Sequence, residues 1–162
     1  MAQLIKQGAL VNNDQWQRIE DDAVMADYSL ISLKRWQENS AALAPLAEAG
    51  KVGLFLQSEE TADLIGNDSR HFTLIAIDFP KFSDGRGYSA ARLLRERHGY
   101  RGELRAMGDV LIDQLFFMKR CGFDSYALRD DQELETALAA FSTFTVNYQT
   151  DVHEPRPLFR RR

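Results

Sequence analysis

Short apolar runs typical of β-strands alternate along the chain with longer segments of helical periodicity. The strand-like runs lie at 28–33, 51–57, 71–79, 101–107, 124–128 and 143–148, after a weak leading hairpin at 3–11 and 16–20. The helical segments lie at 34–49, briefly from 58 onward, and at 88–98, 109–120 and 131–142. Repeated strand–helix units predict a mostly parallel sheet, covered by helices and joined by right-handed crossovers.

Glycines and polar residues mark the ends of these helices. Three helical segments are followed by glycines suited to helix C-termini, namely Gly50, Gly99 and Gly122. Ser58 and the two acids after it predict the start of the short second helix, because side-chain oxygens and negative charge favour a helix N-terminus. Asp109 is expected to cap the fourth helix, and Asp130 with Glu133 the last one.

The run HFTLIAIDF at 71–79 is the most apolar, which indicates a central strand with both faces covered. An open, doubly wound sheet of about five or six strands suits the length, whereas a closed eight-stranded βα barrel typically needs ~250 residues. We therefore expect the open sheet. A partial βα barrel, completed by dimerisation, is the alternative. In both architectures ligands bind where the parallel strands end.

Composition sets the limits of the fold. A chain of 162 residues with 44% hydrophobic content suits one domain, expected at 1–150 and followed by a flexible basic tail at 151–162. No apolar run approaches the ~20 residues that span a bilayer, and the N-terminus lacks the layout of a signal peptide. We expect a cytoplasmic protein without a membrane partner.

Cys121 is the only cysteine, which excludes an intrachain disulfide and a cysteine-held iron–sulfur cluster or zinc site within one chain. The three histidines, His71, His98 and His153, are far apart and form no paired spacing. We therefore expect no metal site. Since Cys121 lies at the negative end of a helix among aromatic neighbours, it is expected to be a buried structural residue.

Charge is distributed unevenly. Residues 71–105 contain seven Lys/Arg against four Asp/Glu, whereas residues 1–70 contain six against eleven. This basic segment is too weak for a nucleic-acid surface, and we expect no nucleic-acid partner. It suits a small anion or an acidic partner surface.

The loop after the strand at 71–79 contains GRGYSA at 85–90, which fits the GxGxxA pattern of dinucleotide-binding loops. Five residues separate the strand from the first glycine, however, and the next acid, Glu103, lies at the beginning of its strand. We expect no nicotinamide or flavin here, and no cofactor bound by a recognisable motif.

The same loop has the features of an anion site. Its glycines permit positive φ and a close backbone approach, and the following helix directs N–H groups and its positive end towards the crevice. The residues assigned to this site are Lys81, Asp84, Gly85, Arg86, Gly87 and Tyr88. The alternative is a tight turn at Asp84 and Gly85 whose arginines are solvated or pair with Glu96 and Glu103.

The next strand-end loop adds Arg105, Gly108, Asp109 and Asp113. Two carboxylates on one helix face can bind a metal or transfer protons, but the helix dipole also favours acids in a first turn. If such acids act, Asp78 and Asp109 are the candidate catalytic residues at neighbouring strand ends, with Arg86 and Arg105 between them.

The run FPKFSDGRGYSAARLLRERHGYRGELRAMGDVLIDQLFFMKRCGFD and the terminal PRPLFRRR resemble a bacterial family known as domain of unknown function 934. Its members are labelled probable oxidoreductases of sulfite reduction, mainly through association with genes for sulfite reductase and assimilatory sulfate reduction. The resemblance implies a role in sulfur assimilation and carries over no catalytic residue. The matching positions are Asp84, Gly85, Arg86, Gly87, Tyr88, Arg95, Arg105, Gly108, Asp109, Asp113, Gln114, Arg120 and Cys121.

Two classes of function remain open. As an accessory protein, the chain would bind a small anion, the sulfite reductase haemoprotein or its electron donor. As an enzyme, it would be an oxidoreductase or a subunit of one, and would borrow a cofactor or supply acid and base groups. The accessory role requires fewer functional groups from these residues than catalysis does.

Overall fold

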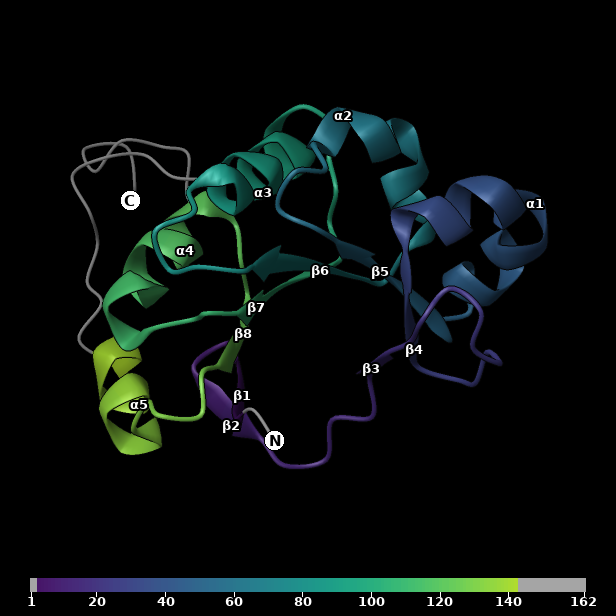
Figure 1. The fold of residues 1–162 in the computed structure, drawn as a ribbon. Helices are drawn as coiled ribbons and strands as arrows, with labels where there is room; N and C mark the ends of the chain where they lie inside the picture. Colours follow the sequence, from purple (N-terminus) through teal and green to yellow (C-terminus); the bar gives the residue numbers. More distant parts are fainter. Residues whose placement is uncertain (1–2, 143–162) are drawn as a thin grey trace, which may run out of the picture.

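The structure, a computed structural model, describes residues 3–142, which form one eight-stranded sheet with helices packed against it (Figure 1). The strands are β1 (Gln3–Lys6), β2 (Ala9–Val11), β3 (Gln17–Arg18), β4 (Ser29–Ser32), β5 (Val52–Leu56), β6 (Leu74–Phe79), β7 (Glu103–Gly108) and β8 (Ser125–Leu128). The α-helices are α1 (Leu33–Glu48), α2 (Ala62–Ile65), α3 (Arg86–Glu96), α4 (Leu115–Cys121) and α5 (Leu134–Ser142), with 3₁₀ turns η1 (Gly66–His71) and η2 (Ile112–Gln114). None of the helices in this part of the chain has the length and apolar character that a membrane crossing needs.

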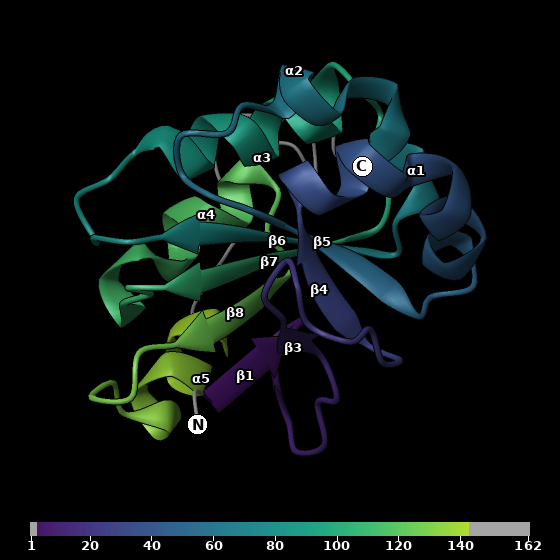
Figure 2. The ribbon, with the colours of Figure 1, turned by 45° about the vertical axis from the view of Figure 1, so that its right-hand side comes forward.

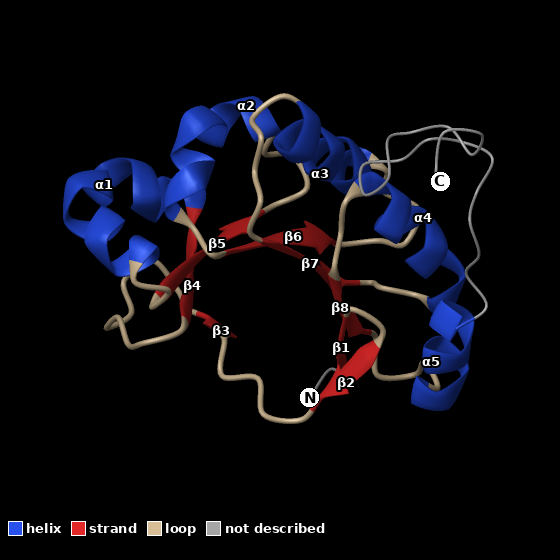
Figure 3. Ribbon diagram, turned by 180° about the vertical axis from the view of Figure 1, so that it is seen from behind, coloured by secondary structure: helices blue, strands red, loops and turns tan. Residues whose placement is uncertain are grey.

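The strand order is β2–β1–β8–β7–β6–β5–β4–β3. Strands β3 to β8 are parallel and follow one another in sequence order, whereas β1 and β2 are antiparallel additions at one edge. Because successive right-handed crossovers all move in the same direction, the connecting helices share one face. Figures 1 and 3 show them along the outer, convex side of the sheet.

The predicted α/β class and the mostly parallel sheet are therefore confirmed. The number of strands is eight, not five or six. The doubly wound arrangement is wrong, because it requires a reversal of strand order that places helices on both faces, and the order from β3 to β8 never reverses. The partial barrel that was the alternative describes this sheet.

The sheet curls into a half-barrel whose two edges are joined by the chain. Residues 12–16 connect β2 at one edge to β3 at the other. The six Cα steps from Val11 to Gln17 span at most about 22 Å, so the edges must approach each other. Figure 3 shows this connection beneath the arch of strands, and Figure 2 shows β8 to β4 following one another around the curl.

The main core lies between the convex face and the helices. There the cross-strand row Leu54, Ile75 and Leu104 is fully buried with the apolar sides of the helices. A second, smaller cluster lies on the concave face. It consists of Leu30, Phe55, Leu74 and Ala76, with Trp16 and Met107 packed against it.

Trp16, from the connection between the two edges, fills the inside of the arch. A Cβ at Gly53 would lie 3.1 Å from its Cζ3 atom and 2.8 Å from Leu30 Cδ2, so β5 has room for the indole only because residue 53 is glycine. All five residues of β5 are buried as a result. A strand with two buried faces is thus produced here by helices outside and a tryptophan inside.

Most predicted elements are confirmed with shifted ends. Helices were expected at 34–49 and 88–98, and α1 and α3 occupy Leu33–Glu48 and Arg86–Glu96. Residues 3–11 do form the expected hairpin as β1 and β2. The segment at 16–20 differs: its two-residue strand β3 pairs in parallel with β4 and takes no part in a hairpin.

Three predicted helix starts are wrong. The helix α2 begins at Ala62 after Thr61, four residues beyond Ser58. The segment after β7 starts with η2, and α4 begins only at Leu115, so Asp109 is not its cap. The helix α5 begins at Leu134, beyond the expected 131. The strand expected at 143–148 and the tail at 151–162 lie outside the described residues.

Candidate functional site at the mouth of the half-barrel

The parallel strands all end at one edge of the sheet, which we call the mouth. It is formed by the loops after β5, β6 and β7 together with the side chain of Arg18 from β3. In βα folds, binding sites form at this edge because the loops and the positive ends of the following helices converge there. Both loops singled out in the sequence, after 79 and after 107, do lie here.

Arg18 is a cation of the mouth that is held by a single aromatic contact. Its register partner is Leu30 on β4, which places its side chain on the concave face. The guanidinium carbon lies 4.1 Å from the centre of the Phe55 ring, a cation–π contact that orients the planar group. Among the described residues it has no hydrogen-bond or ion-pair partner, and the residue is exposed. Its N–H donors are therefore open to a ligand.

Asp78 lies on the same concave face. It is two residues beyond Ala76, the register partner of Phe55. Partial burial raises the pKa of its carboxyl, the Arg18 charge opposes this shift, and the charges of Glu59 and Asp84 add to it. A carboxyl whose protonated form is favoured in this way is typical of binding and catalytic sites.

Glu60 is a second perturbed carboxyl at the mouth. Its Oε2 atom is buried and has no hydrogen-bond partner in the part of the chain that the structure describes. Burial raises its pKa, and the nearby Glu59 adds to this effect, while a backbone hydrogen bond from Gln57 and the charge of Arg18 oppose it. The carboxyl borders a cavity of about 160 Å³ that Ser58, Arg86 and Ser89 also line.

Arg86, a predicted anion ligand, is occupied by the chain itself. Its Nε donates to Asp84 Oδ1 at 3.0 Å, and its Nη2 donates to Asp84 Oδ2 at 2.7 Å and to Ser58 Oγ at 3.0 Å. Hydrogen bonds from Arg86 hold the pKa of Asp84 well below its usual range. The structure therefore has a paired turn here, but the carboxylate that pairs with Arg86 is Asp84 and not the expected Glu96 or Glu103. The exposed Lys81 lies nearby, and Tyr88 packs with its ring centre 5.1 Å from that of Phe79.

The two glycines of the GxGxxA pattern have different roles. Gly85 has φ −88° and open space around it, so neither its backbone nor its surroundings require glycine. A Cβ at Gly87 would lie 2.7 Å from Phe79 Cζ and 3.2 Å from Ile77 Cγ2. Neither glycine uses the positive φ that its lack of a side chain permits, and Gly87 serves the close packing of α3 on β6.

Arg105 does not join Arg86 at the strand ends. It is buried on the concave face, donates to both carboxylate oxygens of Asp14 at 3.0 and 3.1 Å, and donates to Glu103 at 3.0 Å. Lys6 forms an ion pair with Glu103 at 2.8 Å, and Ser125 also donates to this carboxylate. The proposed arrangement with Arg105 between Asp78 and Asp109 is therefore wrong. The network attaches the connection at 12–16 to the sheet beside a groove of about 320 Å³.

Asp109 lies at the strand end next to that of Asp78, and its carboxylate holds loops together. It accepts hydrogen bonds from the Phe82 N–H and from Arg129, each at 3.3 Å. Gly108 has φ +93°, and a Cβ there would lie 2.7 Å from Asp78 Oδ1. Asp113 is exposed in η2. The second loop thus orders the mouth and places the Asp78 carboxyl against a residue without a side chain.

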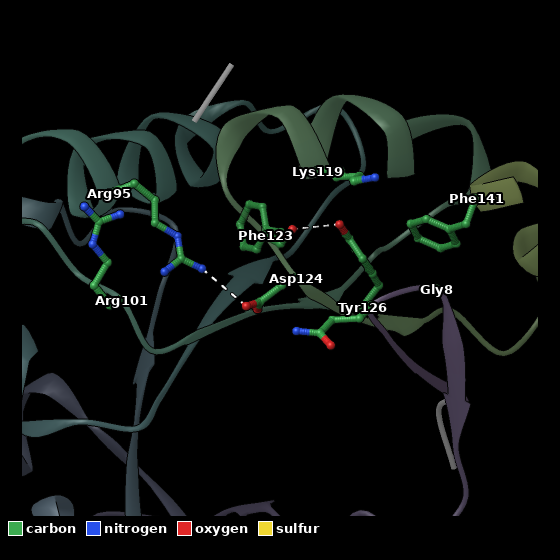
Figure 4. Close-up of a pocket in the computed structure, with 9 residues that line it drawn as sticks. Gly8, Arg95, Arg101, Lys119, Phe123, Asp124, Tyr126 and Phe141 are labelled. Carbon is green, nitrogen blue, oxygen red and sulfur yellow. Dashed lines mark hydrogen bonds and ion pairs between the residues drawn. The ribbon is translucent and has the colours of Figure 1, made fainter. Parts of the chain in front are cut away.

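A cavity of about 500 Å³, larger than the two described above, lies at the opposite edge, where β7 and β8 begin (Figure 4). Arg95 borders it, but this guanidinium donates to the carbonyls of Gly122, Tyr100 and Gly102 and to the Asp124 carboxylate. All five of its N–H donors are thereby used. We favour the smaller mouth over this larger cavity, because the mouth has unsatisfied polar groups.

The described residues contain no group of three or more His, Cys, Asp or Glu side chains arranged to hold a metal ion. Cys121 is buried in α4, as expected, and burial raises the pKa of its thiol. Among the described residues, Arg18, Asp78 and Glu60 are polar groups of the mouth with unused hydrogen-bonding capacity, and so are Lys81 and Gln114 Oε1.

Residues 53–159 match the model of a family described as bacterial protein of unknown function (DUF934). The chain belongs to this family. The DUF934 match covers about two thirds of the chain and begins in β5, so it includes Phe55, Glu60 and Asp78, while Arg18 precedes it. Comparisons with curated proteins and with solved structures found no match.

Sequence reasoning missed Arg18 and Glu60. Arg18 belongs to a strand of only two residues, which is too short to show an alternating pattern. Glu60 was interpreted as a first-turn acid of α2, but it precedes that helix and its carboxyl turns inwards. The one sequence signal for Arg18 is its spacing from Trp16, because residues two apart in a strand share a face.

Proposed function

We propose that this protein is an accessory protein of assimilatory sulfite reduction that binds a small oxyanion at the mouth of its half-barrel. Arg18 carries the proposal: its guanidinium is exposed, stacked on Phe55 and without a partner among the described residues. A planar guanidinium presents a fork of donors that matches the oxygen atoms of carboxylate, phosphate and related anions. The pathway comes from the family resemblance, and the binding chemistry comes from this residue.

The predicted cations Arg86 and Arg105 support this choice by contrast, whereas Lys81, the third predicted cation, is exposed. Arg86 is paired with Asp84, and Arg105 is paired with Asp14 and Glu103. A ligand that bound either of them would have to displace a carboxylate of the chain. Arg18 has to give up only water.

The alternative is an enzyme of the same pathway. It is favoured by the raised pKa values of Asp78 and Glu60, since carboxyls of this kind can exchange protons with a bound substrate. Electron transfer would then require a borrowed cofactor. A shift in melting temperature on addition of a flavin or nicotinamide would favour the enzyme over the accessory protein.

The test is complementation of a gene deletion in the source bacterium. We expect the deletion strain to grow poorly on sulfate as sole sulfur source and normally on cysteine, and we expect wild-type protein to restore growth on sulfate. Arg18→Ala should fail to restore growth, whereas Arg70→Ala, which removes an exposed arginine of η1 at the opposite edge, should restore it. Normal growth of the deletion strain on sulfate would contradict the sulfur role, and full restoration by Arg18→Ala would contradict the mouth as the site.

A further inference from the structure

We infer that the mouth selects an oxyanion that carries a proton, and that Asp78 is the residue that accepts the hydrogen bond from this proton. The inference rests on the proposed oxyanion site and names the class of ligand that it takes. Its basis is the position of one acceptor-only group beside the unpaired cation Arg18.

The sheet register places the two groups within reach of one small ligand. The Arg18 guanidinium lies over Phe55, which pairs with Ala76 on the neighbouring strand. Asp78 is two residues further along that strand on the same face, which corresponds to about 7 Å along the strand and about 5 Å across it. Arg18 and Asp78 also interact electrostatically, so an anion held by Arg18 at ~3 Å lies on the same face as the Asp78 carboxyl and close to it.

The position of the Asp78 carboxyl is set by its surroundings. A Cβ at Gly108 would lie 2.7 Å from Asp78 Oδ1, so this oxygen packs directly over the end of β7. The charged groups that act on Asp78 are Arg18 of β3, Glu59 of the loop after β5 and Asp84 of the loop after β6. Asp84 is itself paired with Arg86, so Arg18 faces two carboxyls, Asp78 and Glu59, that have no such partner. This is a poor environment for an anion that has only acceptor atoms.

A proton on the anion reverses this balance. An ionised carboxylate only accepts hydrogen bonds, and an O–H donor on the ligand forms a short, charge-assisted bond with it. Sulfate carries no proton at neutral pH and would place its oxygens against those of Asp78. Hydrogen phosphate and hydrogen sulfite each present one O–H group, and their remaining oxygens can accept from Arg18.

The pKa of Asp78 supports the same conclusion. Burial favours its protonated form, so a proton shared between the ligand and this carboxyl is stabilised from both sides. Glu60, whose buried Oε2 atom has no partner, lies under the influence of the same Arg18 and of Glu59 and Asp21.

The test is titration calorimetry of the full chain at pH 7 and constant ionic strength, with inorganic phosphate, sulfate and oxygen-free sulfite as probes. We expect phosphate to bind at least tenfold more tightly than sulfate, and sulfite to bind more tightly than sulfate. Asp78→Asn, which offers an amide donor of the same size, should shift the phosphate-to-sulfate ratio by at least tenfold towards sulfate. Asp22→Asn, which removes an exposed carboxylate from the loop after β3, should leave the ratio unchanged.

Arg18→Ala separates the two proposals. If it abolishes binding of phosphate while wild-type protein binds phosphate and sulfate equally, or while Asp78→Asn leaves their ratio unchanged, the proton selectivity is wrong and the oxyanion site stands. If wild-type protein binds none of the three anions at millimolar concentration, or if Arg18→Ala binds them as wild-type protein does, the oxyanion site itself is wrong. Circular dichroism of each variant establishes that it is folded.

Discussion

Arg95 and Arg18 lie at opposite edges of the same parallel sheet and differ in whether their N–H donors are used. Arg95 donates at 2.8 to 3.5 Å to three backbone carbonyls and one carboxylate, where β7 and β8 begin. Arg18 stacks on an aromatic ring near the strand ends and donates to no described residue. An arginine beside a cavity therefore indicates a ligand-binding site only if its N–H donors are still unused.

The same distinction separates the two cavities. The larger one adjoins a guanidinium that holds two strand entrances together, which is a structural task. The smaller cavity at the mouth is lined by Glu60, whose Oε2 atom is buried without a partner among the described residues, and the exposed Arg18 lies on the concave face of the same mouth. Buried polar groups without a partner are rare in folded proteins, because each has lost its water without replacement.

The largest effect is expected from removing the Arg95 side chain. Arg95→Ala leaves the carbonyls of Gly122, Tyr100 and Gly102 and the Asp124 carboxylate without this donor, which should lower the free energy of unfolding by about 3–5 kcal/mol. Urea unfolding measures this loss. Arg101→Ala, which removes an exposed arginine at the same edge, should change the free energy of unfolding by less than about 0.5 kcal/mol.

The matching substitution at the mouth is Arg18→Ala. Only the exposed contact with Phe55 is lost, so we expect a decrease of no more than about 1 kcal/mol. Equal losses for Arg18→Ala and Arg95→Ala would remove the distinction between the two edges.

An intermediate effect on stability is expected from substitution of Gly85 and Gly87, the two glycines of the loop after β6. Gly87→Ala introduces a Cβ 2.7 Å from Phe79 Cζ and should lower the free energy of unfolding by about 1–3 kcal/mol, because the helix must move away from the strand. Gly85→Ala, in open space at negative φ, should be neutral or stabilising by up to about 1 kcal/mol. If Gly85→Ala were the more damaging of the two, Gly85 would have a role that packing does not explain.

Much of the sheet could be predicted from the chain because strands and helices have local patterns. The strand order could not, since it depends on pairings between distant segments. The fully buried strand β5 favoured a doubly wound sheet, because helices on both faces produce the same apolar run. In the folded protein Trp16 covers the inner face of β5, and one tryptophan from a connecting segment gives no periodic signal.

The site was predicted only in part, because its loops follow from local patterns whereas its side-chain pairs involve other segments of the chain. The loops after β6 and β7 could be located because parallel strands end at a common edge. Which arginine is unpaired could not be inferred, because it depends on side-chain partners. Arg86 is paired with Asp84, two residues earlier in the chain. Arg105 is paired with Asp14, which lies in the connection at 12–16 between the two sheet edges.

The smallest effect, and one of opposite sign, is expected at Asp78. Its pKa is raised by burial, so the folded state binds this proton more tightly than the unfolded state does. Above the raised pKa the ionised, half-buried carboxyl costs stability, and this cost disappears as the pH falls towards the ordinary aspartate value of about 3.9. Asp78→Asn should therefore raise the free energy of unfolding at pH 7, by no more than about 1 kcal/mol because the group is partly exposed.

Urea unfolding of wild-type protein and Asp78→Asn at pH 7 measures the gain in the free energy of unfolding. The same comparison near pH 4 should show that this gain is smaller. Asp109→Asn is the contrasting variant, because this carboxylate accepts from the Phe82 N–H and from Arg129, and its loss should destabilise the fold at pH 7. A gain in stability on loss of a side chain is expected where that side chain serves a ligand. If Asp78→Asn instead destabilised the protein at pH 7, the carboxylate would be holding the fold, and the mouth would resemble the opposite edge.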